Sequence, residues 1–329
     1  MSKKKQILIT GVAGMIGSHL LDTLLESGDY RVVGLDNLSF GRLENIARWR
    51  TDPDLRFVEG DVLDGGLVRE LARDVQTIVH LAAVKKIGEK DFRLPTLLVN
   101  TRGTENILEA ARLSGATVVF ASTSDVYGMS PDLPFQEDGD LLIGPSMIKR
   151  WSYAVSKLYG EQLAFGYHLQ YRLPVVVLRY FGGFSSRSSF QWSGGHIPIF
   201  VRAVLNDQEV VIHGDGSQTR SMAYVSDLIR GTVLAMEKPA AVGRIINLGN
   251  TEEVSVLKAA QVIHRLAATG KELKLKFIPF SEIFGQYRDI TRRCPDLTRA
   301  REVLGYSPQV SFEDALKITI KAVRERNRD

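Results

Sequence analysis

Short runs of apolar, largely β-branched residues alternate with longer segments of helical pattern through the first half of the chain. The short runs predict strands and the longer segments predict helices. Strands that alternate with helices are typical of parallel sheets covered on both faces, so we predict an α/β fold with a doubly wound parallel sheet. The expected strands are Gln6–Thr10, Arg31–Asp36, Leu55–Glu59, Thr77–His80, Thr117–Ala121 and Val175–Arg179, and the expected helices include Met15–Glu26, Thr96–Leu113 and Trp151–Tyr171.

This alternation breaks after residue 179. Residues 181–195 are rich in Gly, Ser and aromatic residues, which is typical of a loop that reaches over a site. A helix from Ile197, a strand at Val210–His213 and the segment from Val254 predict a smaller α/β lobe, while Ile245–Asn247 is expected to return to the main sheet. We therefore expect one domain of residues 1–179, with 221–250 returning to it, and a smaller lobe of residues 180–220 and 251–329.

Composition and charge narrow the class of protein. Of the 329 residues, 44% are hydrophobic and 24% are charged, as in an ordinary globular enzyme. The net charge of +4 is spread along the chain, so we expect no nucleic-acid partner. No stretch approaches the roughly 20 apolar residues of a membrane span, and the single Cys294 agrees with a reducing compartment. We predict a cytoplasmic protein without a membrane partner or a metal site.

Two residues have the spacing of an acid–base pair. Tyr153 and Lys157 are four residues apart, so on a helix their side chains lie on one face. An isolated tyrosine has a pKa of about 10, which a nearby ammonium and an oxidised nicotinamide would lower, so that Tyr153 could take a proton from a hydroxyl. Thr123 would bridge the substrate oxygen and Tyr153. Tyr-x-x-x-Lys often occurs by chance, but its place after a strand that ends in a Ser/Thr cluster favours a catalytic interpretation.

A glycine-rich loop follows the first expected strand. Gly11, Gly14 and Gly17 would permit a tight turn and a close approach of the backbone to a pyrophosphate at the helix N-terminus. Three glycines alone could simply form a turn. Asp36 ends the second strand, 19 residues beyond Gly17 (36 minus 17), where a carboxylate would bind ribose hydroxyls and favour NAD over NADP. The pattern predicts an NAD site.

These features together resemble the signature of the extended short-chain dehydrogenase/reductase family. The resemblance rests on residues 122–128 (Ser-Thr-Ser-Asp-Val-Tyr-Gly), on the Tyr153/Lys157 pair and on the glycine loop, and it covers nearly the whole chain. It implies a Rossmann sheet, bound NAD, a UDP-sugar substrate and a homodimer joined through the helices at 96–113 and 151–171.

The resemblance also assigns further residues to the cofactor. Asp61 and Val62 would contact adenine, and residues 81–83 would pass beneath the cofactor. Lys85, at the start of the stretch 84–89, matches a lysine that lies beside the cofactor in UDP-galactose 4-epimerases; a solvated lysine pair is an equal alternative. The whole expected set is Gly11, Gly14, Met15, Ile16, Gly17, Asp36, Asn37, Ser39, Gly41, Asp61, Val62, Leu81, Ala82, Ala83, Lys85, Asn100, Ser122, Tyr153, Lys157 and Tyr180.

Two arginines are expected to bind the substrate. Arg220 ends a Gly-Asp-Gly-x-x-x-Arg element, and Arg293 matches a second arginine that relatives use near the diphosphate or the sugar. A guanidinium can grip phosphate oxygens with two hydrogen bonds, although either arginine could be a surface residue. Thr123 would also contact the substrate, and so would His196 or Trp192, for which packing of the loop is an equal interpretation. Gly182 stands where the family has an asparagine that anchors the sugar nucleotide.

The family's reactions all begin with oxidation of carbon 4 of the sugar. Dehydration usually requires an Asp-Glu pair where Ser124 and Asp125 stand, so it is disfavoured. The motif Ser-Thr-Ser-Asp is one methylene from the Ser-Thr-Ser-Glu of UDP-glucuronate decarboxylases, whereas the Lys85 region favours epimerases. We expect 4-epimerisation of a UDP-hexose or UDP-hexuronate, with UDP-glucuronate decarboxylation and a non-catalytic NAD-binding regulator as alternatives. The expected catalytic residues are Thr123, Ser124, Asp125, Tyr153 and Lys157.

Overall fold

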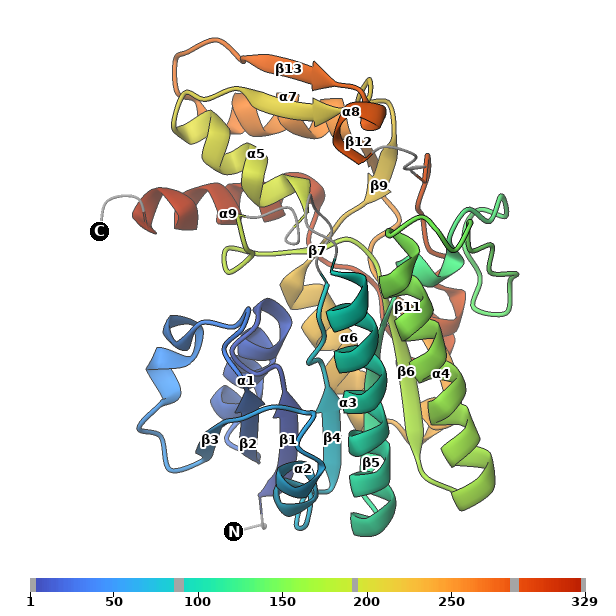
Figure 1. The fold of residues 1–329 in the computed structure, drawn as a ribbon. Coiled ribbons are helices and arrows are strands. Elements are labelled where there is room, and N and C mark those ends of the chain that lie inside the picture. Colours follow the sequence, from blue (N-terminus) through green and yellow to red (C-terminus); the bar gives the residue numbers. More distant parts are fainter. Residues whose placement is uncertain (1–3, 86–91, 191–194, 285–289, 327–329) are drawn as a thin grey trace.

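Seven parallel strands form the central sheet of the computed structural model, which describes residues 4–85, 92–190, 195–284 and 290–326 (Figure 1). The order across the sheet is β11-β6-β5-β4-β1-β2-β3. The chain reverses its direction of winding between β1 and β4, and ligands bind to such sheets at the carboxyl ends of the strands beside this point. The predicted doubly wound, Rossmann-like sheet is confirmed. Its strands are β1 (Lys5–Thr10), β2 (Tyr30–Asp36), β3 (Leu55–Glu59), β4 (Thr77–His80), β5 (Thr117–Thr123), β6 (Val175–Tyr180) and β11 (Arg244–Leu248).

Alternate strand residues pack against helices on opposite faces of this sheet. Ile7 and Ile9 of β1 share a buried core with helices α1 and α6, whereas Leu8 between them belongs to a second core with α2, α3 and α4. This follows from the two-residue repeat of a strand, and it explains why the strands are apolar along their whole length. The helices are α1 (Met15–Ser27), α2 (Gly65–Leu71), α3 (Arg93–Ser114), α4 (Trp151–Tyr171) and α6 (Val225–Glu237).

Smaller elements lie beyond the main sheet, in the upper part of Figure 1. They include three two-stranded sheets, in which β7 pairs with β10, β8 with β13 and β9 with β12. The expected strand at Val210–His213 and the expected helix, which begins at His196, are present. These elements are β7 (Gly183–Phe184), β8 (Val210–His213), β9 (Thr219–Ser221), β10 (Ala223–Tyr224), β12 (Glu253–Ser255), β13 (Leu275–Ile278), α5 (His196–Leu205), α7 (Val256–Ala267), α8 (Phe280–Phe284) and α9 (Phe312–Arg326). The chain also forms the 3-10 helices η1 (Leu43–Trp49), η2 (Ser124–Tyr127) and η4 (Pro239–Ala241) and the π-helix η5 (Ala300–Leu304).

The segment after β6 is not wholly irregular. Gly183 and Phe184, inside the predicted loop, form the short strand β7. The predicted return of the chain to the main sheet is confirmed, because Ile245 to Asn247 pair with β6 within β11. The proposed domain boundaries stay a prediction. Trp192 and residues 86–89, which the sequence singled out, lie outside the described residues.

Candidate active site

The end of β5 and the start of α4 bring the residues of the candidate catalytic motif together. Tyr153 and Lys157 lie one turn apart on α4, whose bounds match the predicted helix. Thr123 is the last residue of β5, and its hydroxyl hydrogen-bonds the Tyr153 side chain. Asp125 follows within η2, and its backbone amide donates to the Thr123 hydroxyl at 3.2 Å. A possible base, a bridging hydroxyl and a carboxylate therefore meet at the edge of the sheet where ligands bind.

The environment of Tyr153 differs from the expectation. Burial raises its pKa, the Asp125 carboxylate raises it further, and only the hydrogen bond with Thr123 opposes them. Lys157 is not among the groups that shift this pKa. The protein's own groups therefore keep Tyr153 protonated, because loss of water around a phenolate costs more than Thr123 returns. A lowered pKa at this residue would need an additional positive charge.

Lys157 is a buried cation, with only 2% of its surface exposed. Burial lowers its pKa to about 7; Glu161, one turn further along α4, opposes this effect, and Lys85 adds to it. The Lys157 ammonium also lies 4.9 Å from the centre of the Phe120 ring. A lysine with a pKa near neutrality can lose or gain charge in the ordinary working range of an enzyme.

This buried lysine should make stability depend on pH. A lysine has a pKa of about 10.4 in an unfolded chain, so between pH 7 and 10 the unfolded state binds the additional proton and stability rises with pH. We expect the free energy of unfolding of the NAD-free protein to rise by about 2 kcal/mol more than that of Lys157→Met between pH 7 and 9. Urea unfolding of both proteins at these pH values measures the difference. Parallel pH dependences would show that Lys157 is not a buried titrating group.

Positive side chains surround Asp125. The Arg293 Nη2 lies 2.8 Å from Asp125 Oδ1, the Arg150 Nη2 lies 3.8 Å from the same oxygen, and the Lys85 Nζ lies 3.7 Å from Oδ2. Burial raises the pKa of the Asp125 carboxyl, but Arg293, Lys85, Arg150 and Arg220 together lower it below its ordinary value. Asp125 is therefore ionised at neutral pH, and among the described residues several cations act on this one carboxylate.

Lys85 lies at this cluster. Besides its ion pair with Asp125, its ammonium is 5.3 Å from the centre of the Tyr153 ring. The Lys85 side chain is 43% exposed. It is therefore also partly solvated, as expected from the alternative interpretation of a solvated lysine pair. Asn100 holds the adjoining backbone, since it accepts from the Val84 amide at 2.8 Å and donates to the hydroxyl of Ser156 on α4 at 2.9 Å. The structure places Lys85 beside Tyr153, and its expected contact with the cofactor stays a prediction.

The glycine loop after β1 has the shape that a dinucleotide requires. A Cβ on Gly17 would lie 2.1 Å from the Gly11 carbonyl oxygen, and one on Gly11, which has a φ of +74°, would lie 2.9 Å from the Ala82 nitrogen. No side chain caps the N-terminus of α1 at Gly14, so the first amides of that helix can bind a phosphate. Among the expected residues of this helix, Met15 contacts the Ser188 hydroxyl through its sulfur at 2.9 Å.

Asp36 is held in place at the end of β2. Its carboxylate accepts hydrogen bonds from the backbone amides of Ala13 at 2.9 Å and Leu38 at 2.8 Å, which links β2 to the glycine loop. Burial raises the pKa of this carboxyl, and the two amides oppose that effect. A Cβ on Gly41 would lie 2.7 Å from the carboxylate. The side chains of Asn37 and Asp61 meet nearby at 2.8 Å. These residues fit the ribose and adenine of NAD.

The other expected cofactor residues have different surroundings. The Tyr180 hydroxyl lies in the protein interior and hydrogen-bonds the Thr232 hydroxyl at 2.7 Å. The Ser122 hydroxyl donates to the buried carboxylate of Glu161. Val62 is buried beside Gly103. Ile16 lies in the first turn of α1. Ser39 lies on the loop that follows β2, and Leu81, Ala82 and Ala83 lie on the loop that follows β4.

The residues expected to bind the substrate do not all lie in the cluster around Asp125. Arg293 contacts both Asp125 and the Ser124 hydroxyl, the latter at 3.4 Å, so it belongs to the cluster. Arg220, on β9, helps to lower the pKa of the Asp125 carboxyl through its positive charge. Its guanidinium donates a hydrogen bond to the Thr219 carbonyl at 2.7 Å. His196 lies at the start of α5, where its ring packs against Phe200 at 5.4 Å between centres.

Two features of the site were not predicted. Arg150 is buried, and its guanidinium lies 3.8 Å from the Asp125 carboxylate. Because Arg150 precedes Tyr153 by three residues, or about one helical turn, this spacing could have predicted that Arg150 lies at the site. The Arg179 guanidinium binds Glu161 with hydrogen bonds of 3.0 and 2.7 Å in the interior. That contact joins β6 to α4, and no local pattern in the sequence indicates it.

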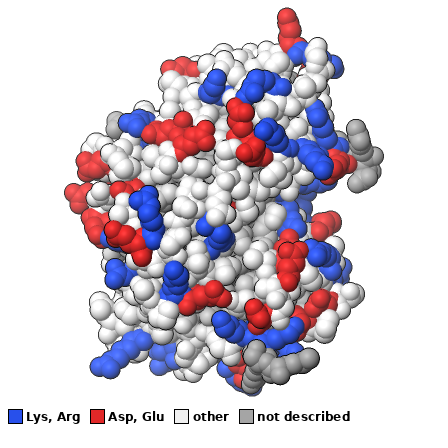
Figure 2. All heavy atoms as spheres, turned by 180° about the vertical axis from the view of Figure 1, so that it is seen from behind, with Lys and Arg blue, Asp and Glu red and all other residues white. Residues whose placement is uncertain are grey.

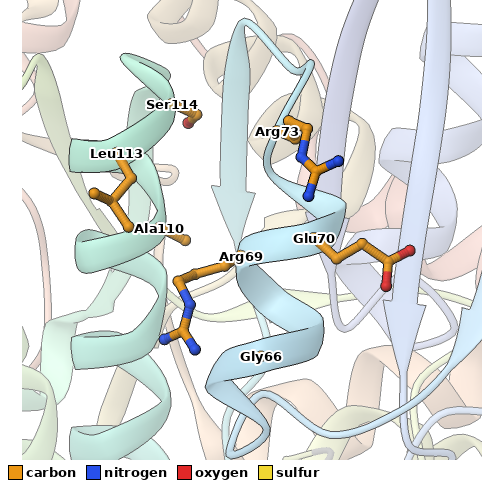
Figure 3. Close-up of a pocket in the computed structure, with 7 residues that line it drawn as sticks. All are labelled: Gly66, Arg69, Glu70, Arg73, Ala110, Leu113 and Ser114. Carbon is orange, nitrogen blue, oxygen red and sulfur yellow. The ribbon is translucent and has the colours of Figure 1, made fainter.

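Other charged surfaces and cavities of the described part of the chain lie away from the Tyr153 motif. Figure 2 shows acidic and basic side chains mixed on the face opposite to the view of Figure 1. A cavity of about 440 Å³ lies between α2 and α3 (Figure 3), and none of the residues expected to bind NAD or substrate lines it. Its lining residues are Gly66, Arg69, Glu70, Arg73, Ala110, Leu113 and Ser114. In the described part of the chain, no group of three or more His, Cys, Asp or Glu side chains is placed to hold a metal ion.

The chain that carries the glycine loop, Asp36 and the Tyr/Lys pair also matches a family model. Residues 7–249 match the model of the NAD dependent epimerase/dehydratase family. The chain belongs to this family. Its members of known structure include proteins solved with bound NAD, so the cofactor predicted from the sequence is confirmed, as is the resemblance to the extended short-chain dehydrogenases.

Relatives in the NAD dependent epimerase/dehydratase family differ in activity. The UDP-N-acetyl-alpha-D-glucosaminuronate decarboxylase of Bacillus cytotoxicus is 39% identical over 99% of this chain and all of the relative. The UDP-glucuronic acid decarboxylase 1 of Danio rerio is 35% identical over 97% of this chain and 72% of the relative. The structure of UDP-glucuronic acid 4-epimerase from Bacillus cereus, in complex with UDP-glucuronic acid and NAD, is 31% identical over 98% of this chain and 99% of that one, with a TM-score of 0.87.

Within the ranges that the structure describes, every helix is too short or too polar to cross a bilayer. The predicted cytoplasmic location stays a prediction.

Proposed function

We propose that this chain is an NAD-dependent decarboxylase of a UDP-hexuronate, acting through a 4-keto sugar. The observation that carries the proposal is the cluster of cations around Asp125, directly beside Tyr153. Several positive side chains at the reacting end of the site suit a sugar that carries a carboxylate. The two decarboxylases of acidic UDP-sugars among the relatives support the same reaction, which the sequence placed second.

The residues present can perform the first stage. Tyr153 would accept the proton of the 4-hydroxyl, while Thr123, hydrogen-bonded to Tyr153, would hold the same oxygen. Bound NAD supplies the hydride acceptor and a positive charge that would oppose the effect of burial on the tyrosine. The Lys157 ammonium, one turn away, would help to hold the cofactor's ribose. The result at the sugar is a ketone at carbon 4.

Loss of carbon dioxide then follows from the position of that ketone. The carboxylate on carbon 5 is β to the ketone, so the bond between carbons 5 and 6 can break, and its electron pair moves into the carbonyl. Carbon dioxide leaves and negative charge collects on oxygen 4. The neutral Tyr153 and Thr123 hydroxyls would both donate hydrogen bonds to that oxygen. A proton added at carbon 5 completes the decarboxylated 4-keto sugar.

A second candidate is 4-epimerisation of the same acidic sugar. The structure of the related UDP-glucuronic acid 4-epimerase favours it, and so does Lys85 beside the Tyr153 ring. An epimerase needs the same oxidation but must keep the carboxylate while the 4-keto sugar turns over. Both reactions therefore use a site for an acidic sugar. They differ in whether the bond between carbons 5 and 6 breaks and in whether the 4-keto sugar turns over.

Proton NMR of the NAD-loaded protein with UDP-glucuronate, UDP-N-acetylglucosaminuronate and UDP-glucose separates these reactions. Decarboxylation yields a pentose or 4-keto pentose nucleotide from an acidic sugar and leaves UDP-glucose unchanged. A carbon-4 epimer with all carbons retained would replace the proposal by epimerisation. NAD binding with no turnover in a broad panel of nucleotide sugars would favour the non-catalytic regulator.

We further propose a homodimer in which α3 and α4 pair with the same helices of a second copy. These helices pack side by side (Figure 1), and they carry large apolar side chains that are exposed, among them Leu94, Val155 and Leu169. We expect the double substitution Val155→Glu/Leu169→Glu to halve the mass measured by light scattering after gel filtration. Ile318→Glu, at an exposed apolar residue of α9, is the control. A wild-type monomer would contradict the dimer.

A further inference from the structure

Asn247, near the end of β11, has a fully buried side chain with partners in two other parts of the chain. Its Oδ1 accepts a hydrogen bond from the Tyr127 hydroxyl at 2.8 Å. Its Nδ2 donates to the backbone carbonyls of Phe135 at 2.9 Å and Asp296 at 3.2 Å. Because carbonyl oxygens can only accept, the NH2 group must face them, and this fixes the orientation of the side chain. Asn247 therefore joins β11 to η2 and to the segment that contains Asp296.

The two segments that Asn247 joins each carry one partner of an ion pair in the candidate site. Tyr127 lies two residues after Asp125 within η2. Asp296 lies three residues after Arg293. The Arg293 Nη2 lies 2.8 Å from Asp125 Oδ1, although the two residues are 168 positions apart in the sequence (293 minus 125). Tertiary contacts must therefore place them, and Asn247 hydrogen-bonds to the chain on both sides of the pair.

The backbone of the segment that carries Arg293 is held from two sides. On one side, the Ser221 amide of β9 donates to the Arg293 carbonyl at 3.1 Å. On the other side, the Asp296 amide donates at 2.9 Å to the Phe135 carbonyl, which is the same carbonyl that accepts from Asn247. A buried carbonyl that loses a donor is destabilising. Removal of the Asn247 amide is therefore expected to shift this segment and the arginine on it.

We propose that Asn247 is a positioning residue that sets the distance between Arg293 and Asp125. It acts through Tyr127 on the side of the carboxylate and through Asp296 on the side of the guanidinium. The inference rests on the proposed function, because the Arg293–Asp125 pair belongs to the cluster that carries that function. A misplacement of about 1 Å in a site can lower a rate by about 10²-fold, so a residue that holds the pair in place can affect turnover strongly.

A double-mutant cycle tests whether Asn247 acts through Arg293. We expect Asn247→Leu to lower kcat/KM of the NAD-loaded protein for UDP-glucuronate by about 10²-fold. Arg293→Lys should lower it as well, since lysine lacks the planar fork of arginine. In the Arg293→Lys background, however, Asn247→Leu should change kcat/KM by about twofold or less, because the guanidinium that it would misplace is already absent. A residue that only stabilises the fold would lower kcat/KM by the same factor in both backgrounds.

Asn250→Leu is the matched control for this cycle. Asn250 is also a buried asparagine, three residues later, but its amide donates to the Val310 carbonyl at 3.3 Å. Its replacement should have the same small effect in both backgrounds. If Asn247→Leu also has equal effects in both backgrounds, the inference is overturned. If circular dichroism shows that Asn247→Leu is unfolded, Tyr127→Phe takes its place, since it removes the hydroxyl bonded to Asn247 and keeps the ring.

A crystal structure of Asn247→Leu tests the same inference without turnover. We expect the 2.8 Å contact between Arg293 and Asp125 to be lost, and a variant that retains it would overturn the inference. Failure of the proposed function is seen separately, in the wild type. If proton NMR shows that the wild type makes an epimer, the cycle is measured on that reaction, and if it converts no UDP-sugar, the crystal structure decides.

Discussion

Replacing Tyr153 by phenylalanine should lower kcat by about 10²- to 10⁴-fold, the usual contribution of a positioned acid–base group. The substitution removes one hydroxyl and leaves the ring, so the contact of Lys85 with the aromatic face and the packing of α4 are retained. Affinities for NAD and for the UDP-sugar should therefore change little. Turnover is measured by NMR, and binding of both ligands by titration.

Tyr167→Phe provides a matched control for this prediction. Tyr167 lies on the same helix, and its hydroxyl contacts Glu109 at 3.4 Å, away from the candidate site. Its loss should leave turnover unchanged. Turnover at the wild-type rate in Tyr153→Phe would remove the tyrosine from the mechanism. If the wild-type protein bound NAD but converted no sugar, the regulator would become the better description of this chain.

The elements of the fold could be predicted because their signals are local. The bounds of β3, β4 and α4 match the sequence prediction residue for residue, since apolar runs and turn residues fix where each begins and ends. The catalytic pair followed from a spacing of four residues on one helix. The glycine loop and Asp36 followed from their places at the ends of β1 and β2, a local feature of parallel sheets.

The electrostatics of the site could not be predicted in the same way. The charge around Asp125 depends on Lys85, Arg150 and Arg293, which come from three distant segments. The expectation that Lys157 would lower the pKa of Tyr153 considered two neighbours on a helix and omitted the burial of both. Burial is a property of the whole fold, and here it is the largest influence on each of the two residues.

A buried ion pair beneath the site should have the largest effect on stability. Glu161 on α4 accepts two hydrogen bonds from Arg179 on β6 and one from Ser122 at the end of β5. Both charged side chains are at most 3% exposed. Because this contact ties the catalytic helix to two strands beside Thr123 and Lys157, we expect it to hold Tyr153 and Thr123 in register.

Removal of one partner leaves the other charge buried and alone. We expect Glu161→Met to lower the free energy of unfolding by about 3–5 kcal/mol, and Arg179→Met to have a similar effect. The double variant should be less destabilised than the sum of the two, because no uncompensated charge remains. Urea unfolding of the four proteins gives the coupling energy. Arg56→Gln, which breaks the exposed pair with Glu70, should cost about 1 kcal/mol or less. A double variant as unstable as the sum would show that packing, and not the charge pair, holds α4 on the sheet.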